Sequence, residues 1–230
     1  TMIPRGGVFD KIGNWYEQSL VMLQWLRLLK EDVQMVCWEP LGAPGEGVDY
    51  QIREGDHLVA VQCKTRRGGS WSPSDLEQPL RYARQRLDRD ADRYRFLSNL
   101  RPCALAEAAE AAMRHERADQ WLAEDEGTRR KFVSHLGCNP DQAHELDVAF
   151  ELFRRIDVQS QDQEALNERI REDVKLLAGD QRDSLLNLLF ELAQPNTLGW
   201  EWTAVDLHAR VQEHGIRLFD HWDANSSVAW

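Results

Sequence analysis

The sequence lacks the features that mark membrane and secreted proteins. No apolar run reaches the ~18 residues that a membrane-spanning helix needs, and no signal peptide is visible. The longest apolar stretch, residues 20–29, is interrupted by Gln24 and Arg27. We therefore expect a cytoplasmic protein with no membrane partner.

Familiar metal and nucleotide signatures are also missing. The four cysteines form no CxxC pair, the seven histidines form no HExxH, and no GxxxxGK[ST] phosphate loop occurs. These absences argue against a zinc site and against an NTPase module within this stretch. We expect reduced, mostly buried thiols at Cys37, Cys63, Cys103 and Cys138.

Positive charge is in deficit, with 28 Lys and Arg against 39 Asp and Glu, a formal net charge of -11. Proteins that bind nucleic acid tightly gain affinity by neutralising phosphates with Lys and Arg. The charge therefore argues against a constitutive, high-affinity nucleic-acid binder. It leaves room for an enzyme that touches DNA through a small basic site and engages it tightly only when several copies act together.

The chain has enough apolar material for a real core, with 230 residues of which 42% are hydrophobic. Its pattern predicts an α/β core at residues 1–100 and a mainly helical extension at 101–230, packed on the core. Strands are predicted at 33–40, 48–54, 57–64, 93–99 and 154–160. Helices are predicted at 14–32, 76–90, 103–125, 128–137, 140–153, 162–179, 182–194 and 203–215.

Local signals fix several of these boundaries. Asn14 is a candidate N-cap with Glu17 three residues later, and Ser72 or Ser74 is a candidate cap for the helix at 76–90. Gly55-Asp56 is a hairpin turn signal, and Gly179 fits a helix C-cap.

Polar side chains gather at the ends of the predicted hairpin. Gln62 and Lys64 are two residues apart and leave one face of the strand, whereas Cys63 leaves the other. The hairpin can bring Asp49 beside them, and Glu17 starts a buried helix just before these strands. A surface ion pair with a solvent-facing Gln62 is the simpler alternative. The convergence of two acids, an amide and an ammonium instead favours a site for a hard divalent cation such as Mg²⁺.

The spacing resembles the PD-(D/E)xK nuclease superfamily: Asp49, twelve intervening residues, then Gln62-x-Lys64. Glu17 matches the acid often found upstream of the core in that superfamily. The chain departs from the motif at Val48, which stands where proline is named, and at Gln62, which replaces the second carboxylate as in QxK variants. The loss of a negative charge should weaken metal binding.

A longer match resembles the N-terminal endonuclease domain of bacterial anti-phage effectors, namely CBASS-type effector nucleases and antiviral STAND NTPases (Avs proteins). It spans residues 5–99 and is looser beyond. The matching residues are Gly6, Gly7, Lys11, Gly13, Tyr16, Glu17, Glu39, Pro40, Gly47, Asp49, Tyr50, Gln62 and Lys64. The resemblance implies a restriction-endonuclease-like fold, with a small mixed sheet flanked by helices. It also implies a double-stranded DNA endonuclease that is activated when copies come together. We further expect that the chain is a fragment, with NTPase or sensor domains following it.

The leading hypothesis assigns roles to the motif residues. Asp49 is a ligand of Mg²⁺ (or Mn²⁺), and the backbone carbonyl of Cys63 is a further ligand. Gln62 is a second ligand or a group that positions water. Lys64 is the catalytic cation, and Glu17 is an outer acid or ligand.

DNA contacts are expected in the loop that follows the catalytic strand, from Arg66 and Arg67. The arginines of the 76–90 helix either contact DNA as well or form a solvated face.

Two other hypotheses stay open. One is a catalytically silent nucleic-acid-binding or oligomerising module, which Gln62 and the acidic charge favour. The other is a restriction or repair nuclease.

Overall fold

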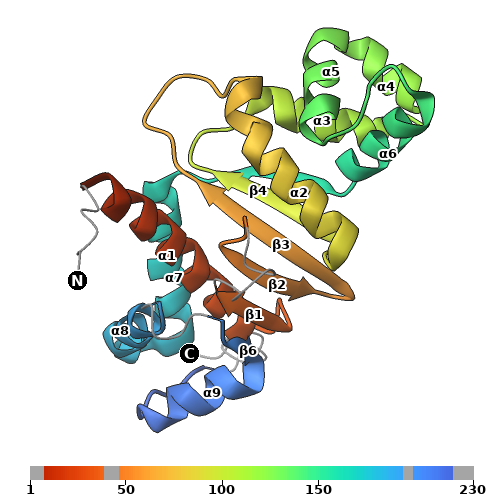
Figure 1. Cartoon of the computed structure of the whole chain (residues 1–230). Helices are drawn as coiled ribbons and strands as arrows, with labels where there is room; N and C mark the ends of the chain where they lie inside the picture. Colours follow the sequence, from red (N-terminus) through yellow and green to blue (C-terminus); the bar gives the residue numbers. More distant parts are fainter. Residues whose placement is uncertain (1–7, 39–46, 194–198, 220–230) are drawn as a thin grey trace, which may run out of the picture. The chain divides into compact units, whose positions relative to one another are not determined.

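The computed structural model describes residues 8–38, 47–193 and 199–219 (Figure 1). The strands are β1 (Met35–Trp38), β2 (Tyr50–Glu54), β3 (His57–Lys64), β4 (Arg93–Ser98), β5 (Ile156–Ser160) and β6 (Glu201–Thr203). The α-helices are α1 (Val8–Leu29), α2 (Glu77–Arg89), α3 (Cys103–Arg114), α4 (Ala118–Glu124), α5 (Glu126–His135), α6 (Ala143–Phe153), α7 (Gln163–Ala178), α8 (Arg182–Leu192) and α9 (Ala204–Glu213). Two 3₁₀ turns, η2 (Pro73–Leu76) and η3 (Gly179–Gln181), precede α2 and α8.

The strands form one mixed sheet in the order β5-β4-β3-β2-β1-β6. β3, β4 and β5 run parallel, with Gln62 opposite Phe96 and Lys64 opposite Ser98. β1 and β6 are antiparallel. A mixed sheet with flanking helices confirms the α/β expectation.

The chain divides into two compact units, each built from separate segments. The first unit comprises residues 1–40, 52–55 and 162–230, and the second comprises residues 41–51 and 56–161. Helices α3–α6 thus belong with β3, β4 and β5, whereas α7–α9 belong with α1 and β1. The helical part expected from residue 101 onward is shared between both units.

In the first unit, α1 packs against α7, α8 and α9. Its residues Leu20–Leu26 are all buried, as expected for a helix that is apolar on nearly every side. The predicted N-cap at Asn14 is wrong, because α1 begins at Val8 and Asn14 lies within it. The helical spacing of Val8 and Ile12 extends the apolar pattern toward the N-terminus. α7 has its expected C-cap at Gly179.

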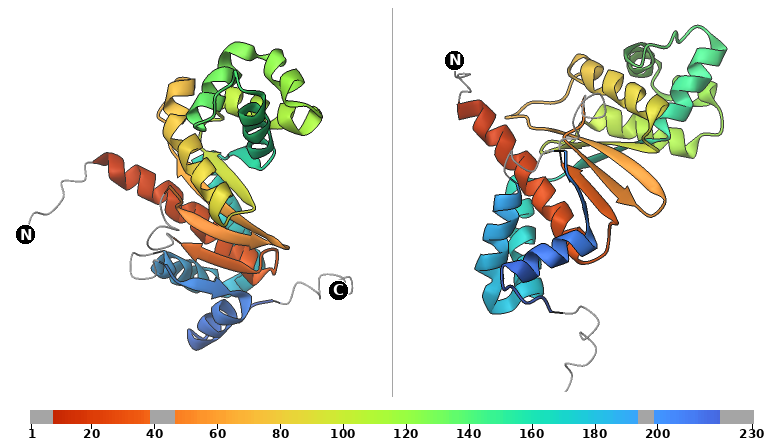
Figure 2. Two further views of the ribbon diagram at one scale, coloured as in Figure 1. Left: turned by 45° about the vertical axis from the view of Figure 1, so that its right-hand side comes forward. Right: turned by 60° about the horizontal axis from the view of Figure 1, so that its bottom comes forward.

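In the second unit, α2 packs on β4 and α3 packs on β5, while α3–α6 gather into one group of helices (Figure 1 and Figure 2). Trp121 and Phe153 are fully buried at the centre of that group, with ring centroids 5.0 Å apart. Ser72 caps η2 through a capping box with Asp75. The predicted serine cap of the 76–90 helix is wrong, because α2 has Leu76 at its N-cap and no side-chain cap. This packing fixes β3 and β4, on which the candidate site is built.

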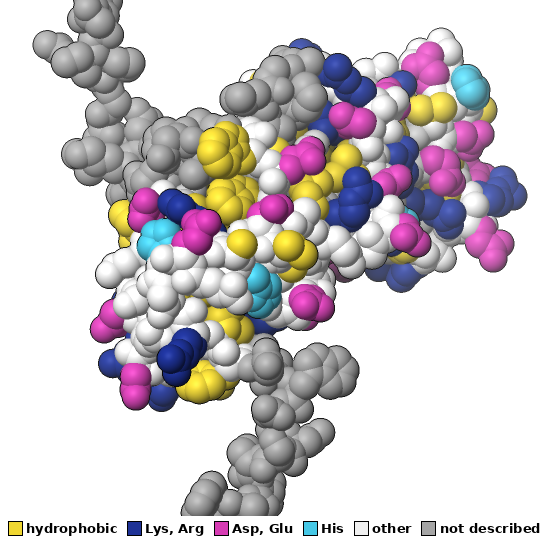
Figure 3. Space-filling model, turned by 90° about the horizontal axis from the view of Figure 1, so that it is seen from below, with side chains coloured by type: hydrophobic (Ala, Val, Ile, Leu, Met, Phe, Trp, Pro, Cys, Tyr) yellow, Lys and Arg dark blue, Asp and Glu magenta, His cyan; other side chains and the backbone are white. Residues whose placement is uncertain are grey.

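Charged side chains of both signs are interspersed on the face shown in Figure 3. Many charged side chains of the protein are paired; Arg130 on α5, for example, pairs with Glu126 of the same helix and with Asp141 in the segment that precedes α6. Within the described residues, no helix has the length and apolar character needed to cross a membrane. Cys37, Cys63 and Cys138 are buried free thiols and Cys103 is an exposed one, as expected for reduced cysteines.

Candidate functional site

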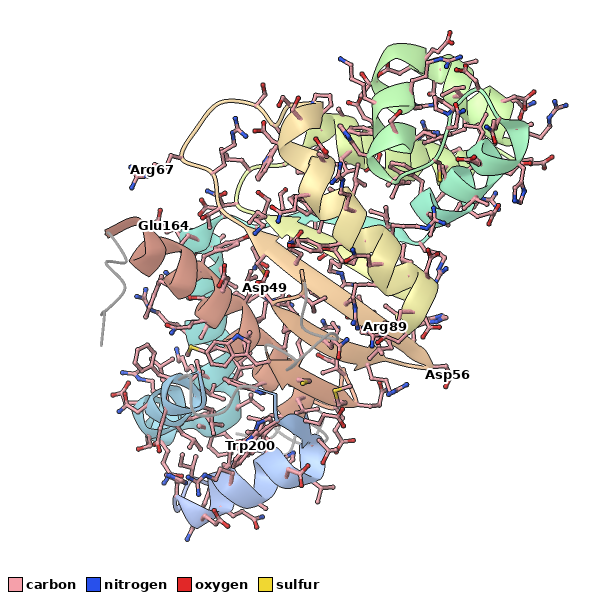
Figure 4. The ribbon with its side chains drawn as sticks, viewed as in Figure 1. Asp49, Asp56, Arg67, Arg89, Glu164 and Trp200 are labelled. Carbon is pink, nitrogen blue, oxygen red and sulfur yellow. The ribbon has the colours of Figure 1, made fainter. Side chains whose placement is uncertain are left out.

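Asp49 is held against the end of β3 within the second unit (Figure 4). Its N–H donates to the carbonyl of Val61 at 2.9 Å, and its Oδ2 accepts from the N–H of Cys63 at 2.5 Å. The hairpin turn at Gly55-Asp56 produces this pairing, as the sequence predicts. The structure thus brings Asp49 beside the strand segment that carries Gln62, Cys63 and Lys64.

The three residues at the end of β3 differ in exposure. Gln62 is 3% exposed, Cys63 is fully buried, and Lys64 is exposed. Gln62 Oε1 lies 3.0 Å from the hydroxyl of Tyr94 on β4. Gln62 is therefore a buried amide with a defined partner, and the simpler interpretation of a solvent-facing side chain is wrong.

The half-buried position of Asp49 changes its acidity. Burial raises the pKa of the Asp49 carboxyl above its ordinary value, and the hydrogen bond from Cys63 and the charge of Lys64 oppose that rise. A carboxylate that has lost part of its hydration in this way gains more than a solvated one from a nearby cation. The electrostatics of Asp49 therefore suit a cation-binding role.

Two residues that shape the site were not assigned roles from the sequence. Gly47 has φ of +69°, and a Cβ at this position would lie 2.0 Å from Cγ of Tyr82, so only glycine fits. Tyr94 is 1% exposed, and its hydroxyl also lies 3.0 Å from the carbonyl of Gly47. A tyrosine on a buried parallel strand needs a partner for its hydroxyl, which is the signal that could have pointed to Tyr94.

Arg66 holds the loop that follows β3. Its guanidinium pairs with Asp75 at 2.8 Å and lies over the ring of Trp71, 5.1 Å from the centroid. Its backbone N–H and carbonyl bond to the side chain of Asn99 at 2.7 and 2.8 Å. Arg66 thus has a structural task in this loop, whereas Arg67 is exposed and points away from the ribbon (Figure 4). Both remain candidates for DNA contact.

The arginines of α2 do not form one exposed basic face. Arg81 and Arg84 pair with acids one turn away, Glu77 and Asp88. Arg86 is 1% exposed, so it is a buried residue and not part of a solvated or DNA-contacting surface.

Glu17 lies on α1 in the first unit and is half-buried. Its role as an outer acid stays a prediction. Four other residues of the longer match, Gly6, Gly7, Glu39 and Pro40, lie outside the described residues.

The donors at the end of β3 fit a weak site for Mg²⁺. Among the described residues, no group of three or more His, Cys, Asp or Glu is arranged to hold a metal ion. Asp49 offers one carboxylate, Gln62 an amide oxygen and Cys63 a backbone carbonyl, all hard oxygen donors. Mg²⁺ is commonly bound through one or two carboxylates and completes its shell with water and substrate phosphate. The set is adequate for such a cation and poor for zinc, which prefers nitrogen and sulfur.

No family model and no curated protein matches the sequence. Solved structures are nevertheless similar in fold. A Cap4 SAVED/CARF-domain containing receptor from Moraxella osloensis has a TM-score of 0.55 and 13% identity, over 92% of this chain and 48% of the receptor. The Cap4 receptor from Acinetobacter baumannii, solved with the cyclic trinucleotide 3'3'3'-cAAA, has a TM-score of 0.52 and 11% identity, over 93% and 49%.

The same Acinetobacter baumannii receptor with 2'3'3'-cAAA gives a TM-score of 0.52 over 93% of this chain and 46% of that one. The chain thus shares its fold with part of these receptors and spans about half of their length. At this level of identity, the similarity is one of fold.

Proposed function

We propose that this chain is the metal-dependent, double-stranded DNA endonuclease domain of a bacterial anti-phage effector. The observation that carries the proposal is the arrangement at the end of β3. A half-buried carboxylate (Asp49) is fixed by Cys63 N–H beside a buried amide (Gln62) and an exposed ammonium (Lys64). The order and spacing of these groups match the QxK form of the PD-(D/E)xK motif.

In this proposal, Asp49, Gln62 and the Cys63 carbonyl hold Mg²⁺ (or Mn²⁺). Such an ion would lower the pKa of a bound water and would neutralise charge on a phosphate oxygen. Lys64, exposed at the strand end, positions the scissile phosphate and stabilises the charge that develops on its oxygens. Arg67 binds the DNA backbone beyond the scissile phosphate. With one carboxylate in place of two, these residues would hold the ion weakly.

The fold similarity supports an anti-phage setting. The Cap4 receptors carry SAVED/CARF domains, and this chain spans about half of their length. A sensor in the rest of the protein would bring nuclease domains together as a homo-oligomer. The net charge of -11 fits such control, because a single domain with this charge attracts DNA weakly.

A second candidate is a sensor for cyclic oligonucleotides, since one of the similar receptors is described with a cyclic trinucleotide bound. Isothermal titration of this chain with 3'3'3'-cAAA tests it directly. Binding that persists in Asp49→Asn would favour the sensor over the nuclease.

Plasmid cleavage tests the nuclease. Supercoiled and linear DNA are incubated with Mg²⁺, Mn²⁺ or EDTA over a range of protein concentrations, using wild type, Asp49→Asn and Lys64→Ala. Lys131→Ala is the matched control, because Lys131 is an exposed lysine of the same unit. We expect metal-dependent cleavage that rises steeply with concentration, falls at least ~100-fold in the two site variants and is unchanged in the control. If neither this chain nor the full-length protein with its trigger cleaves DNA, the proposal is wrong.

A further inference from the structure

The hydroxyl of Tyr94 lies between two oxygen atoms. It is 3.0 Å from the backbone carbonyl of Gly47 and 3.0 Å from Oε1 of Gln62. Tyr94 is 1% exposed and Gln62 is 3% exposed, so water cannot substitute freely for either partner. Each of these polar groups must therefore be satisfied by the others.

A phenol has one proton and can donate it to one acceptor only. The carbonyl of Gly47 is always an acceptor, and Gly47 is held in place by its φ of +69° and its close packing on Tyr82. If Tyr94 gave its proton to Gln62 instead, the Gly47 carbonyl and the phenol oxygen would face each other at 3.0 Å with lone pairs only. Such an arrangement leaves the partly buried Gly47 carbonyl facing a second acceptor, which is unfavourable.

One arrangement satisfies all three groups. Tyr94 donates to the Gly47 carbonyl, and the amide of Gln62 is turned by half a rotation so that its Nε2 donates to the phenol oxygen. An amide turned in this way has the same shape, and its nitrogen and oxygen are told apart by their hydrogen-bond partners. The amide oxygen of Gln62 then lies on the side away from Tyr94.

We propose that Tyr94 is a positioning residue that holds the Gln62 amide with its nitrogen toward the phenol and its oxygen presented as a ligand for the divalent cation. This inference rests on the proposed function. It also gives a reason for an amide at this position. A carboxylate has two equivalent oxygens and needs no orientation, whereas a glutamine can serve as an oxygen ligand only if its amide is fixed the right way round.

The orientation can be tested without metal or DNA. Protein labelled with ¹⁵N at glutamine side chains is examined by NMR, and the Gln62 resonances are assigned by their loss in Gln62→Glu. We expect an Nε2 proton of Gln62 to be protected from exchange in wild type and to exchange at least ~10-fold faster in Tyr94→Phe. The matched control is Tyr82→Phe, which removes a hydroxyl of the same unit that accepts from Gln78. Equal exchange in wild type and Tyr94→Phe would overturn the proposed orientation.

The role toward the cation is tested by a double-mutant cycle on Mn²⁺ binding, measured by electron paramagnetic resonance. We expect Tyr94→Phe to weaken Mn²⁺ binding about 10-fold when residue 62 is Gln and to have no effect in the Gln62→Glu background. An equal loss in both backgrounds would show that Tyr94 merely supports the fold, and the inference would be wrong. If no variant binds Mn²⁺, the proposed function fails, and the NMR result still decides the amide orientation by itself.

Discussion

Replacing Gly47 by alanine should destabilise the second unit far more than an ordinary glycine substitution. Gly47 has φ of +69°, and an added Cβ would lie 2.0 Å from Cγ, 2.4 Å from Cδ2 and 2.5 Å from Cβ of Tyr82. Gly69 provides a matched control in the same unit, because its φ is +74° and a Cβ added there would meet nothing within 4 Å. The two substitutions share the backbone strain and differ only in the steric overlap.

The magnitudes follow from these two contributions. A non-glycine residue in the left-handed region costs about 1–2 kcal/mol, which is the whole effect expected for Gly69→Ala. Overpacking adds about 1–3 kcal/mol, so Gly47→Ala should lower the free energy of unfolding by about 2–5 kcal/mol. Either the side chain of Tyr82 or the backbone at Gly47 must move to relieve this overlap.

Urea unfolding followed by circular dichroism measures both variants. With a slope of about 3 kcal/mol/M, the midpoint for Gly47→Ala should fall by about 1 M and that for Gly69→Ala by about half as much. Replacing the Tyr82 ring by a smaller side chain in the double variant Gly47→Ala/Tyr82→Leu should recover part of the lost stability. If Gly47→Ala costs no more than Gly69→Ala, the reasoning from the Tyr82 contact is refuted.

Three further predictions concern charged residues. Burial raises the pKa of Asp49, so the ionised carboxylate opposes folding above that pKa. Asp49→Asn should therefore have a larger free energy of unfolding than wild type at pH 7. This gain should disappear when the urea unfolding is repeated at lower pH, where the wild-type carboxyl is protonated. Equal stability of the two proteins at every pH would contradict this assignment. Arg66→Ala should lower the free energy of unfolding by about 1 kcal/mol in the same urea experiments, because it removes the pair with Asp75 and the contact with the Trp71 ring. Arg66→Lys should not restore this stability, since lysine lacks the planar guanidinium group. Arg67→Ala should raise KM for DNA in the cleavage assay and leave the free energy of unfolding unchanged. A loss of stability as large as that of Arg66→Ala would instead show that Arg67 supports the structure of the loop.

The candidate site could be predicted in part, because its signals are local. The Gly55-Asp56 turn fixes the register of β2 and β3, and alternation along the strand places Gln62 and Lys64 together. That register alone puts Asp49 next to Val61 and Cys63. The partners of Gln62 and Arg66 could not be predicted in this way. Tyr94 and Asn99 lie 32 and 33 residues away in sequence, and no local pattern specifies which side chain meets which.

Strong turn signals and apolar periodicity in the sequence predict several elements of this protein correctly. The strand at 57–64 has its predicted bounds, and the helix predicted at 162–179 is α7, with Asp162 and Gly179 as its caps. Other features depend on how the elements pack. The start of α1, the short strand β6 and the assembly of each unit from separate chain segments depend on contacts between residues far apart in sequence. Those contacts are selected by the free energy of burying surfaces together, which a single segment does not encode.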